Sequence, residues 1–365
     1  MKPSLSLLVL MGCGCAQVEA PPGGPEEFPP PVLLSVRPDS FSVLADRRRP
    51  VVFRFDQTLS EEGVEEAVSV SPRTSPFRVD QGGSEVRIFL EDGWEPGIIY
   101  QVALAPTIRT RWNESPDQET RLIFSTGPEI PATEVAGTVT DRITGRAARE
   151  LRVEAILTPD SLVYATLTDT VGGFSLGSIP EGSYRLRAFE DLDGSRSLDP
   201  FEKRDTARTE VREGEPVRVS LRVLEPDTTP PALISAEYRD GLVLVEFDDY
   251  LDPDLELSSG QVTLASPAGA PLAVTSVSVG EGAVADTPVA VPDTVAAPPR
   301  EELLPSRLVT IVPERELPPG EGYKVSARDV RNLNALSGGG EAGFAVPEPP
   351  DRDETNGSDQ PSDDS

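Results

Sequence analysis

The sequence predicts an all-β protein in which three β-sandwich domains follow one another along the chain, between disordered ends. Proline (38) and glycine (30) are frequent among the 365 residues, while only 5% are aromatic. This composition is typical of many short strands joined by turns rather than of one large α/β core. Strand-length segments that alternate apolar and polar residues recur along the chain, and one arrangement of such segments occurs twice.

The N-terminus has the features of a bacterial secretory signal peptide. Lys2 precedes an apolar run at residues 5–11, which is far shorter than the roughly 20 residues needed to span a bilayer. Residues 10–13 (LMGC) resemble the lipobox of bacterial lipoproteins. The resemblance implies removal of residues 1–12, acylation of Cys13 and anchoring in a membrane by its acyl chains; Gly14, where an Asp would favour inner-membrane retention, points to the outer membrane. The alternative is an ordinary signal peptide with incidental cysteines.

Two further segments lack the apolar residues that a folded core requires. Residues 13–30 are rich in Pro and Gly, which predicts an extended tether behind the anchor. Residues 348–365 are rich in acidic residues, Pro and Ser, which predicts a disordered tail.

A repeated pattern of strands predicts two related domains. The alternating segment at residues 50–59 recurs at 242–251, and the segments at 86–102 recur at 309–325. Strand, turn, strand, Pro-Gly and a Tyr-containing strand form the pattern of an antiparallel β-sandwich. The second copy holds about 31 more residues between its matched segments, by the difference of the offsets 323 − 100 and 247 − 55, which predicts a mobile insertion near 280–302.

Both copies resemble the SbsA-type bacterial Ig-like domain of S-layer proteins and envelope lipoproteins. In the second copy the resemblance lies in residues 229–231 (TPP), 245–251 (VEFDDYL) and 317–325 (LPPGEGYKV). It implies Ig-like sandwiches over residues 31–127 and 227–347. Tyr100 and Tyr323, which follow the Pro-Gly pairs, resemble tyrosine corners, in which a buried hydroxyl caps a loop backbone.

The segment between the two copies has a different signature. Residues 137–145 (GTVTDRITG), 168–174 (TDTVGGF) and 180–184 (PEGSY) resemble the carboxypeptidase-regulatory, or transthyretin-like, β-sandwich. This resemblance covers residues 128–226. It implies a third sandwich of a different kind between the two Ig-like copies.

The composition excludes several classes of function. The chain has no histidine, its two cysteines both lie at the N-terminus, and its formal charge is −29. The commonest general base is therefore missing, and the acidic surface disfavours nucleic-acid partners. Asp56, Asp248 and Asp249 could be imagined as catalytic carboxylates, but their recurrence after the same strand favours turn caps.

One acidic loop has the spacing of a calcium site. Counting from Asp191, oxygen-bearing side chains fall at positions 1, 3, 5, 9 and 12, which are those of Asp191, Asp193, Ser195, Asp199 and Glu202. Arg196 stands where a calcium loop has its glycine, and a strand rather than a helix precedes the loop. Two interpretations remain open: a Ca²⁺ site with hard oxygen ligands, or an acidic turn.

These observations predict a non-catalytic, lipid-anchored envelope protein that serves as a structural, binding or presentation module. Its expected partners are the membrane, through the N-terminal anchor, and an envelope protein or glycan; no cofactor other than Ca²⁺ is expected. The alternative is a carbohydrate-binding or hydrolytic surface protein with its site between domains. A cleft containing both Trp94 and Trp112 would favour that alternative.

Overall fold

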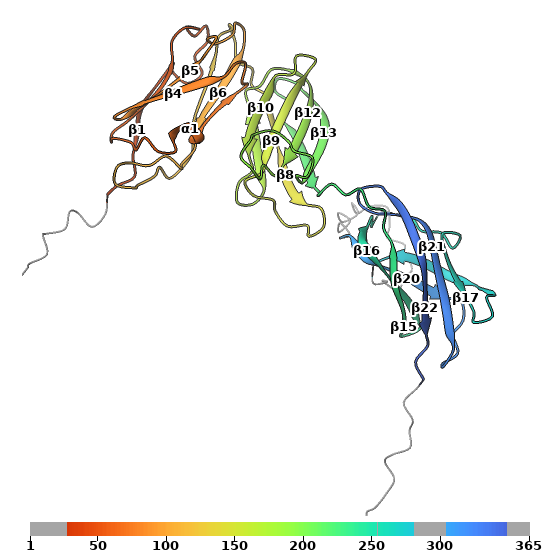
Figure 1. Cartoon of the computed structure of the whole chain (residues 1–365). Coiled ribbons are helices and arrows are strands. Elements are labelled where there is room, and N and C mark those ends of the chain that lie inside the picture. The colour runs from red at the N-terminus through yellow and green to blue at the C-terminus, as the bar shows by residue number, and fades with distance from the viewer. Residues whose placement is uncertain (1–27, 254, 281–303, 349–365) are drawn as a thin grey trace, which may run out of the picture. The chain divides into compact units, whose positions relative to one another are not determined.

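The computed structural model describes residues 28–253, 255–280 and 304–348 (Figure 1). The expected signal peptide, Cys13, residues 13–27 of the tether, nearly all of the insertion and residues 349–365 of the tail lie outside the described residues. The described chain is built almost wholly of strands, so the all-β prediction is confirmed. The one helix among the described residues has four residues. No described helix is long and apolar enough to cross a membrane. The chain divides into two compact units, with the boundary in the sequence between Ile130 and Pro131.

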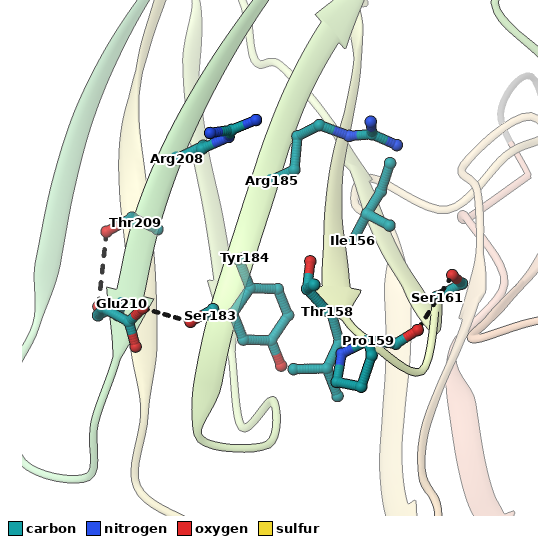
Figure 2. Close-up of a pocket in the computed structure, with 11 residues that line it drawn as sticks. Ile156, Thr158, Pro159, Ser161, Ser183, Tyr184, Arg185, Arg208, Thr209 and Glu210 are labelled. Carbon is teal, nitrogen blue, oxygen red and sulfur yellow. Dashed lines mark hydrogen bonds between the residues drawn. The ribbon is translucent and has the colours of Figure 1, made fainter.

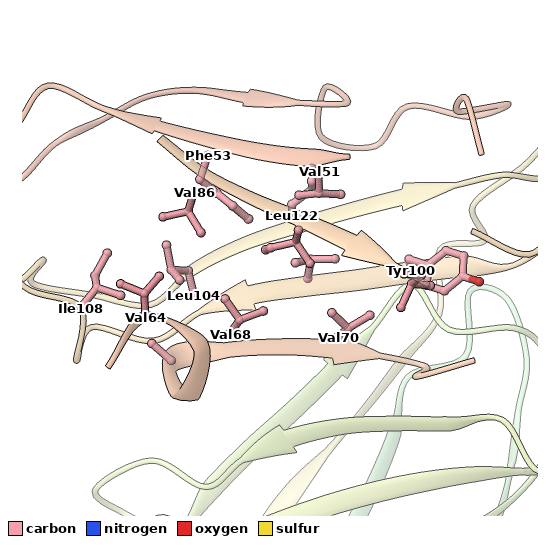
Figure 3. Packing of buried hydrophobic residues seen from close by; sticks show 14 of the residues in the cluster. Val51, Phe53, Val64, Val68, Val70, Val86, Tyr100, Leu104, Ile108 and Leu122 are labelled. Carbon is pink, nitrogen blue, oxygen red and sulfur yellow. The ribbon is translucent and has the colours of Figure 1, made fainter. Parts of the chain in front are cut away.

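The first unit contains one β-sandwich, called here the first sandwich. Four strands form one of its sheets, in the spatial order β1 (Leu33–Arg37), β2 (Val51–Phe55), β5 (Glu85–Leu90) and β4 (Phe77–Gly82). The other sheet holds β3 (Val68–Ser71), β6 (Ile99–Leu104) and β7 (Thr120–Ser125), and the short helix α1 (Val64–Ala67) precedes β3. Figure 3 shows Phe53 and Val86 of the four-stranded sheet facing Leu104 and Val68 of the other across the buried core.

The second unit contains two sandwiches, each with its own buried cluster. The first of these, the middle sandwich, has a four-stranded sheet with the order β10 (Val163–Leu167), β9 (Arg152–Thr158), β12 (Gly182–Phe189) and β13 (Arg204–Val211). Its second sheet has the order β11 (Gly173–Gly177), β8 (Glu134–Asp141) and β14 (Val217–Val223), in which β8 and β14 run parallel.

Close contact between β8 and β14 explains one glycine of the middle signature. A Cβ atom added at Gly137 would lie 1.7 Å from the carbonyl oxygen of Val219 on β14. Only glycine therefore fits at this point of the parallel pair. Two acidic residues of the signature shape turns. Asp141 accepts hydrogen bonds from the backbone N–H groups of residues 143 and 144, and Asp169 accepts them from those of residues 171 and 173.

The third sandwich follows in the second unit and has two four-stranded sheets. One has the order β15 (Leu233–Arg239), β16 (Leu242–Leu251), β20 (Ser306–Pro313) and β19 (Val274–Val279). The other has the order β18 (Pro271–Leu272), β17 (Val262–Ala265), β21 (Gly322–Arg331) and β22 (Ser337–Ala345). Val245, Ile311 and Val325 are fully buried in its core.

The first and third sandwiches share the register of their entry strands. Leu33 pairs with Phe55 in the first, and Leu233 pairs with Phe247 in the third. Each entry strand is irregular directly after this leucine, before the serine two residues further on. The repeat seen in the sequence therefore corresponds to the same strand pairing in both copies.

Candidate metal centre

The acidic loop lies at one end of the β12–β13 hairpin of the middle sandwich. Phe189 at the end of β12 pairs with Arg204 at the start of β13, so residues 190–203 form the connection. The backbone N–H of Glu190 donates to the carbonyl oxygen of Lys203 at 3.0 Å and closes the base of the loop. A loop that leaves and re-enters the same sheet brings residues near its two ends close together.

Three of the five predicted ligands converge in this loop. One carboxylate oxygen each from Asp191, Asp193 and Glu202 lie within 4.8 Å of one another. Carboxylate oxygens are the ligands that Ca²⁺ prefers, and their distances to the ion are about 2.3–2.6 Å. Three such oxygens within 4.8 Å are therefore close enough to share one ion.

Glu202 is the innermost of the three. Its residue surface is only 2% exposed. One carboxylate oxygen accepts a hydrogen bond from the backbone N–H of Leu192 at 2.9 Å, and the other accepts one from Asp199 at 2.9 Å. None of the ion pairs among the described residues involves Glu202. Burial of a carboxylate without a cationic partner is costly, and a bound cation would offset that cost.

Asp191, one of the three converging residues, also has a buried oxygen that accepts no hydrogen bond within the described residues. Its Oδ2 accepts a hydrogen bond from the backbone N–H of Arg196 at 3.0 Å. Its Oδ1 is buried and receives no hydrogen bond within the part of the chain that the structure describes. Buried carboxylate oxygens nearly always have a donor or a cation, so this atom fits the requirement for a ligand oxygen.

Asp193 is held ionised at the exposed side of the cluster. Its Oδ1 accepts a hydrogen bond from the backbone N–H of Ser195 at 2.8 Å. This bond, together with the Ser195 hydroxyl, lowers the pKa of Asp193 below its ordinary value. An ionised, exposed carboxylate beside two less accessible ones gives a cation a negatively charged entry point.

Asp199 is not one of the converging carboxylates, whereas Ser195 interacts with Asp193. The Ser195 hydroxyl donates to the carbonyl oxygen of Ser197 at 3.2 Å, and Asp199 contributes its backbone N–H to Glu202. Arg196 adopts φ of +60°, which is the left-handed conformation that the glycine of a calcium loop supplies. Arg196 therefore differs from the expected glycine in residue type but has the backbone conformation that the glycine would provide.

Residues outside the predicted set fix the loop to the sandwich. Lys203 Nζ lies 3.1 Å from Asp141 Oδ2 at the end of β8, and Arg204 donates to the carbonyl oxygens of Asp199 and Pro200 at 3.1 and 3.2 Å. Burial alone would raise the pKa of Asp141, but hydrogen bonds from Thr144 and Lys203 lower it below its ordinary value. The bond to Asp141 raises the pKa of Lys203. Asp141 belongs to the signature quoted from the sequence, but nothing there indicated its pairing with Lys203.

Asp56, Asp248 and Asp249, which could be imagined as catalytic carboxylates, all make contacts that support the fold. Asp56 accepts a hydrogen bond from the backbone N–H of Val32 at 2.8 Å, and Asp248 accepts one from Ala232 at 2.7 Å. Both cap the segment that enters the first strand of their sandwich, rather than a turn after their own strand. Asp249 accepts a hydrogen bond from the side chain of Asn332 at 2.7 Å.

The two tryptophans have different surroundings within the first sandwich. Trp94 is 2% exposed, and its indole N–H donates to the carbonyl oxygen of Arg49 at 2.9 Å. Trp112 is 60% exposed and stacks on Phe28 with ring centroids 4.4 Å apart. A cleft that exposes both rings is therefore not formed.

Comparisons with known proteins identify no family for this chain. No protein-family model matches the sequence, and no curated protein matches it. Solved structures with some likeness include the Bacillus anthracis TIE protein, at 10% identity and a TM-score of 0.20 over 89% of this chain and 56% of that one. A DUF3823 family protein from Bacteroides uniformis has 13% identity and a TM-score of 0.20 over 60% of this chain and 100% of that one.

The N-terminal part of the bacterial S-layer protein SbsC also shows likeness. It has 13% identity and a TM-score of 0.20 over 54% of this chain and 44% of that one. Scores of this size do not establish a shared fold or a shared function.

Proposed function

We propose that this chain is a non-catalytic cell-envelope protein, anchored by lipid at Cys13, whose middle sandwich binds Ca²⁺ through the acidic loop. The observation that carries the proposal is the convergence of the carboxylates of Asp191, Asp193 and Glu202, together with the buried Oδ1 of Asp191, which accepts no hydrogen bond within the described residues. Support for a non-catalytic role comes from Asp56 and Asp248, whose carboxylates cap the entry segments. The resemblances to Ig-like and carboxypeptidase-regulatory domains agree with a structural or presentation role.

The residues of the loop fit a hard divalent cation. Asp191, Asp193 and Glu202 each have one oxygen in the cluster, and each carboxylate oxygen that accepts one hydrogen bond retains a second lone pair. Neutral nitrogen or thiolate ligands are not available, because the chain lacks histidine and has cysteine only at positions 13 and 15. Oxygen-only ligands favour Ca²⁺ over Zn²⁺.

A bound cation would neutralise the repulsion among the three carboxylates and fix the end of the β12–β13 hairpin. The loop exposes Leu192 (70%) and Phe201 (81%) beside the carboxylates. Ordering the loop would therefore also fix these two apolar side chains. This is how a module of the envelope could present a defined surface to a partner.

Calorimetry tests the calcium site. Titration of the full-length chain with CaCl₂ should give saturable binding to one site, and Asp191→Asn should weaken it at least about tenfold because one ligand charge is lost. Asp240→Asn is the matched control: Asp240 lies in a turn of the third sandwich with φ of +53°, a conformation that Asn also adopts. Absence of binding at millimolar Ca²⁺, or equal loss in both variants, would contradict the site.

Fractionation tests the anchor separately. We expect the chain expressed with its own N-terminus to sediment with membranes and to incorporate labelled palmitate. Cys13→Ser should release it to the soluble fraction, whereas Cys15→Ser should not. Recovery of the Cys13→Ser variant with the membranes would refute the lipid anchor, whatever the result for calcium.

A further inference from the structure

A hollow lies on the outer face of the β9–β12–β13 sheet, away from the acidic loop. Its volume is about 740 Å³. Figure 2 shows its lining: Ile156, Leu157, Thr158, Pro159, Ser161, Ser183, Tyr184, Arg185, Arg208, Thr209 and Glu210. Thr158, Ser161, Ser183 and Thr209 contribute hydroxyl groups to this lining, and the largely buried Ile156 contributes an apolar side chain. Hollows of about 300–1,000 Å³ are the usual size for small-ligand sites.

Two arginines occupy directly opposed positions in this hollow. Arg185 on β12 pairs with Arg208 on β13, and on its other side Arg185 pairs with Ile156 on β9. Paired residues of antiparallel strands project from the same face with Cβ atoms about 4.5–5.5 Å apart. In Figure 2 the guanidinium of Arg185 extends over β9 toward Ile156, while that of Arg208 lies on the β13 side of the same row.

Neither guanidinium is neutralised. Within the described residues, Arg185 and Arg208 form no ion pair and no side-chain hydrogen bond, and both are exposed. Like charges directly opposite each other destabilise a sheet. The chain has nearly twice as many acidic as basic residues, 62 against 33. Even so, no acidic side chain among the described residues forms an ion pair with either arginine.

The other arginines of this sheet face do have partners. Arg152 and Arg187 both contact the carboxylate of Glu154, which is only 3% exposed, and Arg204 donates to two carbonyl oxygens of the acidic loop. Among the described arginines on this face of the sheet, Arg185 and Arg208 are therefore the two without a partner. Glu210, the one carboxylate of the hollow, accepts a hydrogen bond from the Ser183 hydroxyl.

We propose that this hollow binds a sugar residue bearing a single carboxylate, such as a uronic acid unit, with the carboxylate between Arg185 and Arg208. Guanidinium groups bind carboxylates through paired N–H donors. The formal charge of the hollow is +1, from two arginines and Glu210, which matches one anionic group. The overall charge of −29 disfavours long polyanions. The four hydroxyl-bearing residues suit the hydroxyls of a sugar ring, and Ile156 suits its apolar face.

This inference depends neither on calcium nor on the anchor, because none of its lining residues belongs to the acidic loop. Its test uses two methyl glycosides that differ in one group, methyl β-D-glucuronide and methyl β-D-glucoside. Both are titrated into the full-length chain while the arginine Nε–H signals are followed by NMR. The glucuronide should saturably shift the signals of Arg185 and Arg208 and bind at least about tenfold more tightly than the glucoside.

Variants then separate binding from folding. Arg185→Gln and Arg208→Gln should each weaken glucuronide binding at least about tenfold. Because each relieves the repulsion between like charges, neither should lower the melting temperature. Arg218→Gln is the matched control: Arg218 is an exposed arginine on β14, in the opposite sheet of the same sandwich, and its loss should leave the affinity unchanged.

Three results would overturn the proposal. The first is no saturable shift at Arg185 and Arg208 with millimolar glucuronide. The second is equal affinity for acetate, which would show that the sugar ring makes no contribution. The third is a lower melting temperature in Arg185→Gln or Arg208→Gln, because the pair would then serve stability rather than a ligand.

Discussion

The first and third sandwiches begin in the same way and then differ. Both use an aspartate after the repeated phenylalanine to cap the entry segment, at 2.8 Å in the first (Asp56) and 2.7 Å in the third (Asp248). The same aspartate also donates its backbone N–H to the capped residue, at 3.0 Å in both. This two-point clamp joins residues 24 positions apart in the first sandwich and 16 apart in the third, so it belongs to the strand pairing that the two sandwiches share.

The first and third sandwiches differ in the hydrogen bonds of the tyrosines that follow their Pro-Gly pairs. The Tyr100 hydroxyl accepts a hydrogen bond from the backbone N–H of Glu95 at 2.8 Å, as a tyrosine corner requires, and lies 3.0 Å from the Thr74 hydroxyl. The Tyr323 hydroxyl instead donates to the side chain of Glu321 at 3.2 Å. The tyrosine-corner prediction is therefore correct for Tyr100 and wrong for Tyr323, because the latter contacts a side chain and not the loop backbone.

The residue three positions before the glycine accounts for part of this difference. It is Trp94 in the first sandwich and Leu317 in the third, and both are buried. Trp94 packs edge-on against Tyr100 and Phe124, with centroids 4.8 and 5.1 Å away. The aromatic cluster fixes the Tyr100 ring beneath the loop, and the smaller Leu317 provides no such ring contact.

Truncation of these two residues should give the largest contrast. Trp94→Ala should cost about 3–5 kcal/mol of unfolding free energy, and Leu317→Ala about 2–3 kcal/mol, because the larger side chain leaves the larger cavity. Hydrogen exchange of the β6 amides for the first sandwich and of the β21 amides for the third measures each loss. A greater loss at Leu317 would contradict the central role of the aromatic cluster.

Removal of the tyrosine hydroxyls gives the next contrast. Tyr100→Phe should cost about 1–3 kcal/mol, since the backbone N–H of Glu95 would lose its acceptor in a partly buried setting. Tyr323→Phe should cost less than about 0.5 kcal/mol because its partner is a solvent-accessible carboxylate. The same exchange measurement applies. Equal costs would show that the two tyrosines act alike despite their different partners.

Loss of the clamping aspartate should lower the unfolding free energy of the first and third sandwiches by the same amount. Asp56→Ala and Asp248→Ala should each cost about 1 kcal/mol, the net value of one hydrogen bond near the surface. Asp56→Asn and Asp248→Asn retain an acceptor oxygen and should recover most of that loss. Chemical unfolding followed by tryptophan fluorescence suits the first copy, because both tryptophans lie in the first unit. A large loss in only one copy would refute a shared clamp.

A small effect is also expected in the middle sandwich, where the ion pair between Lys203 and Asp141 holds the acidic loop. Lys203→Met should cost less than about 1 kcal/mol near neutral pH, because the pair with Asp141 is partly exposed. The folded-state pKa of Asp141 lies below its ordinary 3.8 and that of Lys203 above its ordinary 10.5. The contribution of the pair is therefore fully present between these values.

Its pH dependence follows from the same two pKa shifts. The contribution is lost as pH falls below 3.8 through the folded pKa of Asp141, and as pH rises above 10.5 through that of Lys203. Unfolding curves of the unchanged chain and Lys203→Met should therefore differ most near neutral pH and converge in acid. A difference that grows below pH 3.8 would contradict this pairing.

The sequence allowed some of these features to be predicted and left others open for physical reasons. Short-range spacing picked out Asp191, Asp193 and Glu202 among five candidate ligands, but it left open whether the loop is a Ca²⁺ site or an acidic turn. Ser195 has the right spacing but bonds locally, and spacing does not reveal the direction of a side chain. The pairing of Arg185 with Arg208 depends on the register of strands 23 residues apart, which periodicity does not fix.

A crystal of the full-length chain grown with CaCl₂ tests the central claim most directly, through an anomalous difference map collected where calcium scatters anomalously. The account predicts one peak with oxygens of Asp191, Asp193 and Glu202 about 2.3–2.6 Å away. The Asp191→Asn variant should lack this peak while keeping the same hairpin. An ordered acidic loop without a peak at millimolar Ca²⁺, or a peak whose ligands exclude these three residues, would contradict the account.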